Sequence, residues 1–261
     1  MSRVLAVTNQ NGGVGKTTTT INLAASLALA EQRVLLVDMD PQGNLTSGIG
    51  LRGRSAPGGT IYDALTGDPD TLDASAFLID TGIEGLRAIA ADRNLTGAEI
   101  ELVTLPEREQ RLRRVLASLR DSFDYVLIDC PPSLGLLTLN ALVAADAVLI
   151  PLHCEYFALE GLADLVATLR RVRAALNPAL DIEGVLLTMH DERTNLGQQV
   201  ARDVRAFFKE KVFDTSIPRN VRLAEAPSHG KPVILYDVKS RGATAYVSLA
   251  KELLARQAAV A

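Results

Sequence analysis

A glycine-rich loop between an apolar strand and a helix is the feature that most constrains this fold. The apolar run of residues 4–8 is broken by the sequence NQNGGVGKTT at residues 9–18, and apolar residues then recur at helical spacing over residues 21–28. Glycines let backbone N–H groups converge on an anion, and the N-terminus of the following helix adds positive potential. This context predicts a phosphate-binding loop formed by Gly12, Gly13, Val14, Gly15, Lys16, Thr17 and Thr18.

Further apolar runs predict the other strands of a sheet. They cover residues 34–37, 125–128, 147–150 and 183–187, with helical stretches between them. Continuous apolar strands that alternate with amphipathic helices are typical of a parallel sheet covered on both faces. We therefore expect an α/β protein with a mostly parallel, twisted sheet flanked by helices on both faces. No internal repeat or low-complexity linker is present, so residues 1–261 are predicted to form a single domain.

Three aspartates directly follow predicted strands. Asp38 and Asp40 come after the second run, and Asp129 comes after the third. An isolated aspartate in such a place commonly forms a turn or caps a helix. Three of them beside a phosphate loop instead favour a site at the carboxyl ends of the strands, where ligands of parallel sheets bind. We expect Lys16 to reach the β- and γ-phosphates of a nucleotide and the Thr17 hydroxyl to bind Mg²⁺, with Asp129 holding the ion as well.

Composition excludes several other classes of protein. Hydrophobic residues make up 48% of the chain and charged residues 22%, which is the balance of an ordinary globular protein. There is no apolar run of about 18 residues and no pattern of a secretory signal, so we expect neither a membrane span nor export. Two cysteines, Cys130 and Cys154, cannot form a disulfide framework, which agrees with a cytoplasmic location.

The loop departs from the standard nucleoside-triphosphatase pattern, which has a glycine where this chain has Gln10. The loop sequence NQNGGVGKTTT resembles that of the ParA/Soj-type chromosome-partitioning ATPases, members of the deviant Walker A class that also contains MinD. Four later segments resemble signature segments of that family in the same order. They are VDMDPQGN at 37–44, DCPPSLG at 129–135, GVLLTM at 184–189 and IPRNVRLAEAPS at 217–228. The resemblance covers residues 3 to about 255.

The resemblance implies a P-loop NTPase fold of the deviant Walker A type that hydrolyses ATP with Mg²⁺. It places Asp40 where the family orients or activates the attacking water, and it implies that Asp38 supports the Mg²⁺ shell. Pro218 and Asn220 match the family's loop that binds the adenine base. Met189 packs either near that base or, slightly favoured, in the core.

One position departs from the family pattern. The family has a signature lysine just before the two glycines, which crosses the dimer interface to the ATP phosphates of the partner, and this chain has Asn11 there. Asparagine can donate a hydrogen bond but carries no charge. We therefore expect ATP binding to persist through Lys16 and the backbone, while hydrolysis and dimer stability are impaired. The alternative is that another residue, such as a nearby arginine, supplies the missing charge.

The net charge of −4 is unevenly distributed along the chain. Residues 193–261 hold 12 Lys and Arg against 6 Asp and Glu, whereas residues 1–192 hold 15 against 25. Affinity for nucleic acid depends on local neutralisation of phosphates rather than on average charge. A solvated basic face is one explanation of this patch. The resemblance implies another, in which Arg193 and Arg222 contact DNA without sequence preference and the patch extends to Lys231, Lys239 and Arg241.

The resemblance also implies an ATP-dependent homodimer, a centromere-binding partner of the ParB/Spo0J type and a nucleoid-associated location. Within the same fold class, the alternatives are an ATPase that positions a protein cargo, a MinD-like membrane-cycling switch and a metabolic ligase of the dethiobiotin type. Residues 243–261 carry only Lys251 and Arg256 as cations, fewer than a basic membrane-binding face needs. We therefore expect this segment to be a helix docked on the sheet, with no membrane binding. Cys130 and Cys154 are expected to be small buried thiols rather than ligands of an iron–sulfur cluster.

Overall fold

One eight-stranded sheet organises the computed structural model, which describes residues 2–155, 158–190 and 194–259. The strand order among these residues is β3-β4-β2-β5-β1-β6-β7-β8, and all neighbours pair in parallel except β3 and β4, which are antiparallel. The strands are β1 (Arg3–Val7), β2 (Val34–Asp38), β3 (Ile79–Asp80), β4 (Leu86–Ile89), β5 (Tyr125–Asp129), β6 (Ala147–His153), β7 (Asp181–His190) and β8 (Ile217–Pro218).

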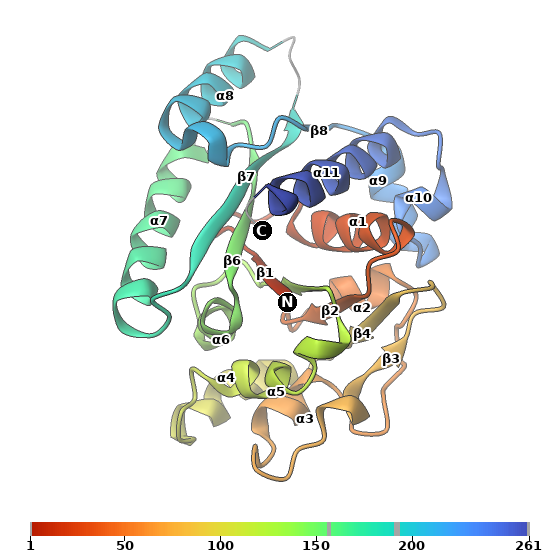
Figure 1. Cartoon of the computed structure of the whole chain (residues 1–261), viewed down its shortest axis with the longest axis vertical. Coiled ribbons are helices and arrows are strands. Elements are labelled where there is room, and N and C mark those ends of the chain that lie inside the picture. Colours follow the sequence, from red (N-terminus) through yellow and green to blue (C-terminus); the bar gives the residue numbers. More distant parts are fainter. Residues whose placement is uncertain (1, 156–157, 191–193, 260–261) are drawn as a thin grey trace.

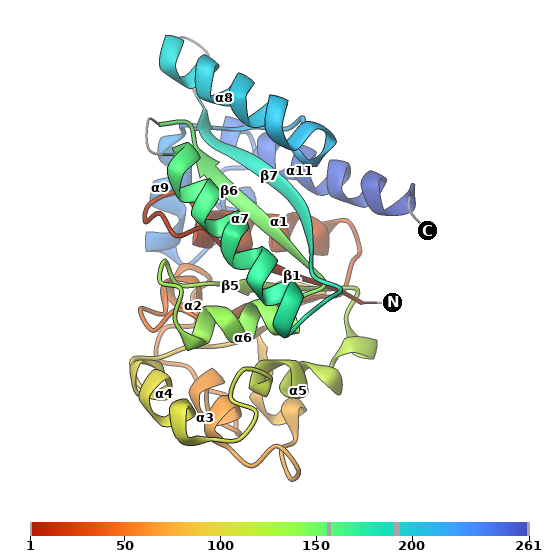
Figure 2. The same cartoon turned by 90° about the vertical axis from the view of Figure 1, so that its left-hand side faces the viewer.

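Two layers of helices cover the two faces of this sheet (Figures 1 and 2). The layer that faces the viewer in Figure 2 consists of α3 (Ile61–Thr66), α4 (Leu95–Glu101), α5 (Arg111–Ala117), α6 (Leu136–Ala144), α7 (Ala158–Ala175) and α8 (Asn195–Phe208). The opposite layer consists of α1 (Lys16–Leu29), α2 (Asn44–Gly48), α9 (Val221–Glu225), α10 (Val233–Tyr236) and α11 (Arg241–Ala258). This arrangement confirms the predicted fold class.

Side chains of the central strands alternate between two separate cores. In β1, Val4 and Ala6 pack under one helical layer, whereas Leu5 and Val7 pack under the other, and all four are fully buried. Because both faces of the sheet are covered, a central strand needs apolar residues at every position. The continuous apolar runs in the sequence are therefore explained by the second layer of helices.

The sheet extends further than the sequence pattern predicts. Strands β3, β4 and β8 were not expected, and β7 is longer at both ends than the apolar run of residues 183–187. β3 and β8 have only two residues each, and β4 carries the exposed Arg87, so none of them produces a strong apolar signal.

The last helix packs against the rest of the molecule, as predicted. Helix α11 contacts α1 and β8, and it buries Tyr246, Leu249 and Leu253 in the core. No helix in the described part of the chain combines the length and apolar character that crossing a membrane requires. Cys130 and Cys154 are free and buried, in agreement with the expectation of buried thiols.

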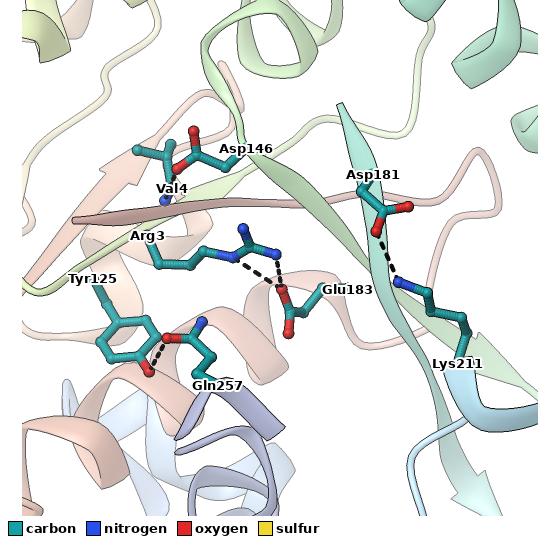
Figure 3. Close-up of polar contacts among 8 residues, drawn as sticks. All are labelled: Arg3, Val4, Tyr125, Asp146, Asp181, Glu183, Lys211 and Gln257. Atoms are coloured by element: carbon teal, nitrogen blue, oxygen red, sulfur yellow. Dashed lines mark hydrogen bonds and ion pairs between the residues drawn. The ribbon is translucent and has the colours of Figure 1, made fainter. Parts of the chain in front are cut away.

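Polar contacts fasten the strands at their amino ends (Figure 3). Arg3 of β1 donates to Glu183 of β7 with an Nη2–Oε2 distance of 2.7 Å, and so reaches past β6, which lies between the two strands. The hydroxyl of Tyr125 in β5 donates a hydrogen bond to Oε1 of Gln257 in α11 at 2.8 Å. These contacts fix the strands at the end opposite to the glycine-rich loop, and so leave the carboxyl ends of the strands free for a site.

Candidate functional site

The glycine-rich loop lies where the chain changes direction across the sheet. β1 pairs with β5 on one side and with β6 on the other, so the loop after β1 opens between the two halves of the sheet. Gly13 and Gly15 have φ angles of 72° and 89°, a left-handed backbone that favours glycine. Nothing lies within 4 Å of a Cβ atom placed on Gly12 or Gly13, so this part of the loop faces open space. The loop is therefore shaped to receive an anion at the N-terminus of α1.

Two buried polar side chains, one from the loop itself and one from β7, hold the loop in this shape. The Asn9 side chain donates from Nδ2 to the carbonyl of Pro151 at 2.8 Å and accepts from the Asn11 N–H at 3.0 Å. The Thr188 hydroxyl of β7 donates to the carbonyl of Val14 at 2.8 Å. Asn9 and Thr188 were not predicted to be site residues, because only the strand order brings Pro151 and Thr188 to the loop.

Lys16 is the cation of the site. Its side chain is nearly buried, and its Nζ donates to the carbonyl of Asn11 at 3.0 Å, across the loop. Burial lowers the pKa of the Lys16 ammonium, and the nearby carboxylates of Asp129 and Asp40 partly oppose this effect. The Lys16 ammonium group is thus held beside the open space that Gly12 and Gly13 face.

Asp129 lies fully buried at the end of β5, facing the first turns of α1. Its Oδ2 accepts a hydrogen bond from the Thr17 hydroxyl at 2.7 Å, and its Oδ1 accepts one from the Thr20 hydroxyl at 3.3 Å. Burial and the neighbouring Asp38 carboxylate raise the pKa of Asp129 well above its ordinary value. A buried carboxylate beside a second one is stabilised by a bound cation, so Thr17 and Asp129 fit a Mg²⁺ site.

Asp38 and Asp40 have different surroundings. Oδ2 of Asp38 accepts from both the N–H and the hydroxyl of Thr46, at 2.9 and 2.7 Å, and burial raises the pKa of Asp38 to about 6. Oδ1 of Asp40 accepts only from the N–H of Gln42, at 2.9 Å, among the described residues. The Asp40 carboxylate therefore keeps acceptor capacity for a further partner, whereas that of Asp38 is largely occupied by Thr46.

Lys16, Thr17 and Asp40 line a cleft of about 910 Å³, whereas Asp38 and Asp129 are fully buried and are not part of its lining. Its lining includes most of the predicted phosphate loop together with Asp40. The segment just after Asp129 forms another wall of the cleft, with Pro131, Pro132 and Ser133. No group of three or more His, Cys, Asp or Glu side chains in the described ranges is placed to hold a metal ion by itself.

The residues predicted to bind the adenine base do not line this cleft. Met189 is half-buried at the end of β7 with a φ of 49°, so it is not a core residue. Asn220 caps α9, where its Oδ1 accepts from the N–H of Arg222 at 2.9 Å. Pro218 lies in β8. Their predicted role in binding the base therefore stays a prediction.

Asn11 directs its side chain toward α7. A Cβ atom placed on Gly161 of α7 would lie 2.8 Å from Oδ1 and 2.9 Å from Nδ2 of Asn11. The amide of Asn11 thus packs where Gly161 leaves space, within its own subunit. A longer side chain at position 11 would extend beyond this contact.

Three of the predicted DNA-binding residues are exposed on one segment of the chain. Arg193 lies outside the described residues. Arg222 of α9, Lys239 and Arg241 are exposed on the α9–α11 region, which Figure 1 shows as one group of helices on the right of the molecule. Lys231 is exposed but lines the cleft beside Pro227 and Ser228, so it can also face a nucleotide.

Comparisons with known sequences identify close relatives. A family model described as an AAA domain matches residues 2–182. The chain is 56% identical over 255 residues to the sporulation initiation inhibitor protein Soj of Bacillus subtilis (strain 168), a match that covers 98% of this chain and 99% of that protein. The chromosome partitioning protein ParA of Myxococcus xanthus (strain DK1622) is 56% identical over 256 residues, covering 98% of this chain and 89% of that protein.

Solved structures share the fold. A cobyrinic acid a,c-diamide synthase from Mycobacterium smegmatis, with bound ADP and magnesium, matches with a TM-score of 0.83 at 40% identity, covering 97% of this chain and 94% of that one. The cell division ATPase MinD of Pyrococcus furiosus matches with a TM-score of 0.78 at 26% identity, covering 97% of this chain and 98% of that one.

Proposed function

Because the chain belongs to the Soj/ParA family of chromosome-partitioning ATPases, we propose that the cleft beside the glycine-rich loop binds ATP with Mg²⁺ and hydrolyses it. The observation that carries this proposal is the meeting of Lys16, Thr17 and Asp129 at an open left-handed loop. The Mycobacterium smegmatis relative binds ADP and magnesium, and another structure of it holds an ATP analogue and magnesium, which supports the same ligands here.

Each site residue then has a chemical role. Lys16 and the N–H groups of the loop bind the β- and γ-phosphates, and the remaining loop residues, from Gly12 to Thr18, enclose them. Asp40, which keeps a free acceptor, orients the attacking water. Thr17 and Asp129 hold Mg²⁺, whose charge stabilises the phosphate oxygens, and Asp38 supports this shell through its contacts with Thr46 and the Asp40 backbone.

Asn11 is proposed to slow this reaction. A charge supplied from a partner subunit to the transferred phosphate accelerates related phosphoryl transfers about 10³- to 10⁵-fold. The neutral amide of Asn11 cannot supply such a charge, and its contact with Gly161 keeps it within its own subunit. We therefore expect ATP binding without rapid turnover, together with a weaker ATP-dependent dimer.

The exposed basic residues of the C-terminal third are proposed to bind DNA without sequence preference when two ATP-bound subunits pair. Arg222, Lys239 and Arg241 are exposed on the same group of helices, which supports this role. A dimer places two such patches side by side, so ATP can raise DNA affinity through avidity. We further propose that one domain, residues 1–261, performs these steps on the nucleoid in the cytoplasm, with a ParB/Spo0J-type protein as the partner that stimulates hydrolysis.

DNA co-sedimentation with ATP tests this proposal. Arg222→Glu is expected to weaken binding to nonspecific duplex DNA at least about tenfold at low salt, because it converts a phosphate contact into a repulsion. Arg113→Glu is the matched control, since Arg113 is exposed on α5, away from α9 (Figure 1). Equal loss in both variants, or no loss in Arg222→Glu, contradicts the assignment. Binding to anionic vesicles in place of DNA would favour a MinD-like switch instead.

A further inference from the structure

Arg222 lies between two carboxylates. Its Nη1 is 2.7 Å from Oε2 of Glu225, and its Nε is 3.2 Å from Oδ2 of Asp237. Glu225 belongs to the same helix, α9, whereas Asp237 follows α10. The guanidinium of Arg222 therefore already has acceptors on two of its edges, in the positions that phosphate oxygens would take.

Neighbouring groups hold both carboxylates in place. The hydroxyl of Tyr236 donates to the same Oε2 of Glu225 at 3.2 Å, and the ring of His229 stacks on the ring of Tyr236 with centroids 4.9 Å apart. The Lys239 N–H donates to Oδ1 of Asp237 at 3.2 Å. The hydrogen bond from Arg222 lowers the pKa of Glu225, so the carboxylate stays ionised beside the guanidinium.

The other exposed cations proposed to bind DNA differ from Arg222 in this respect. Lys231, Lys239 and Arg241 form no ion pair within the described parts of the chain. Among these four cations, Arg222 is therefore the one that is paired with carboxylates within the described part of the chain.

We propose that Glu225 and Asp237 compete with DNA phosphates for Arg222, so that this arginine binds DNA only after it leaves them. The inference rests on the proposed DNA-binding function and specifies how that surface is regulated. The two carboxylates occupy the guanidinium edges that a phosphate would otherwise bind. They lower the affinity of the surface in its resting state and thereby favour release of the DNA.

The expected change in DNA affinity follows from how exposed Arg222 and its two carboxylate partners are. The side chains of Arg222, Glu225 and Asp237 are 50%, 38% and 34% exposed, so water screens each pair. Exposed pairs of this kind are weak, so removing one carboxylate should raise DNA affinity about two- to fivefold. A freed arginine adds about one phosphate contact, which should make the slope of log affinity against log salt concentration steeper by about 0.9.

The experiment compares Glu225→Gln and Asp237→Asn with Asp214→Asn. All three variants remove one negative charge from the C-terminal third, but the exposed Asp214 lies outside the Arg222 network. Affinity for a nonspecific DNA duplex is measured by fluorescence anisotropy with ATP over a series of salt concentrations. Thermal unfolding of each variant checks that it is folded, and Asp237→Asn replaces Glu225→Gln if the latter does not fold.

Glu225→Gln is expected to bind DNA about two- to fivefold more tightly than Asp214→Asn, with the steeper salt dependence. This gain should disappear in Arg222→Ala/Glu225→Gln relative to Arg222→Ala. The inference is overturned if neither carboxylate variant binds more tightly than Asp214→Asn, or if the gain persists without Arg222. If Arg222→Ala binds DNA as the parent does, the proposed DNA-binding role of Arg222 itself fails. If Arg222→Ala weakens binding while the carboxylate variants change nothing, only the competition is refuted.

Discussion

The hydroxyl of Thr17 donates to Oδ2 of Asp129 at 2.7 Å, which joins the second residue of α1 to the last residue of β5. The two residues are far apart in sequence, yet both lie at the edge of the sheet where ligands of parallel sheets bind. Asp129 is at the carboxyl end of β5, and Thr17 is at the N-terminus of α1. This contact brings the two proposed Mg²⁺ ligands together.

Replacing Thr17 by Val should therefore abolish efficient hydrolysis. The variant keeps the shape of the side chain but loses the hydroxyl, so we expect ATP turnover to fall about a hundredfold or more, with a higher Mg²⁺ requirement. Turnover is measured over a Mg²⁺ titration. Thr66→Val is the control, because the Thr66 hydroxyl donates, among the residues that the structure describes, only to the carbonyl of Tyr62 in α3. A Mg²⁺ dependence identical to that of the parent would show that Thr17 does not bind the ion.

Asp40→Ala should separate binding of ATP from its hydrolysis. Without the carboxylate that we propose to orient the attacking water, turnover should drop about 10²- to 10⁴-fold, whereas affinity for a fluorescent ATP analogue should stay within about threefold of the parent. Single-turnover hydrolysis and equilibrium binding measure the two quantities. Asp70→Ala, at an exposed position, serves as the control. Undiminished turnover in Asp40→Ala would assign the catalytic role to another residue.

Asn11→Lys should increase the rate of hydrolysis. The new ammonium can supply the charge that Asn11 lacks, and we expect at least about a tenfold rise at protein concentrations that favour the dimer. Asn11→Gln, which lengthens the side chain without adding charge, should show no such rise. Turnover is compared across a range of protein concentrations. Equal rates for the parent and Asn11→Lys would mean that another cation already supplies the charge.

Asp38 should make the stability of the ligand-free protein depend on pH. Its pKa is raised from 3.8 to about 6 by burial, so the folded state binds the proton more tightly than the unfolded state. The stability gained from this protonation is fully present below about pH 3.8 and is lost as pH rises toward 6. The loss is on the order of 3 kcal/mol, since one pKa unit is about 1.4 kcal/mol.

Asp38→Asn cannot ionise at this position, so its unfolding temperature relative to the parent should rise between pH 4 and pH 7. Thermal unfolding at several pH values measures this difference. Asp70→Asn is the control for loss of an exposed carboxylate. A difference between Asp38→Asn and the parent that stays constant over this pH range would contradict the raised pKa.

Much of the site could be predicted because its signals are local. The loop glycines, Lys16 and the aspartates after the strands are each recognised from a few adjacent residues. The structure places Lys16, Thr17 and Asp40 around one cleft, and the buried Asp129 accepts a hydrogen bond from Thr17. The short strands β3 and β8 could not be predicted, because two residues carry no periodicity. The half-buried position of Met189, with its φ of 49° near the end of β7, could not be predicted either, because no neighbouring residues signal it.

Hydrophobic periodicity, glycine content and charge are properties of neighbouring residues, so the α/β class, the phosphate loop and the uneven distribution of charge can be derived from the amino-acid sequence. Three other contacts arise only in the folded chain: Thr46 occupies the carboxylate of Asp38, Thr188 supports the loop at Val14, and Asp237 joins Glu225 around Arg222. These contacts depend on which strands and helices become neighbours. Strand order and the packing of the two helical layers bring these residues together, and no pattern of adjacent residues predicts that.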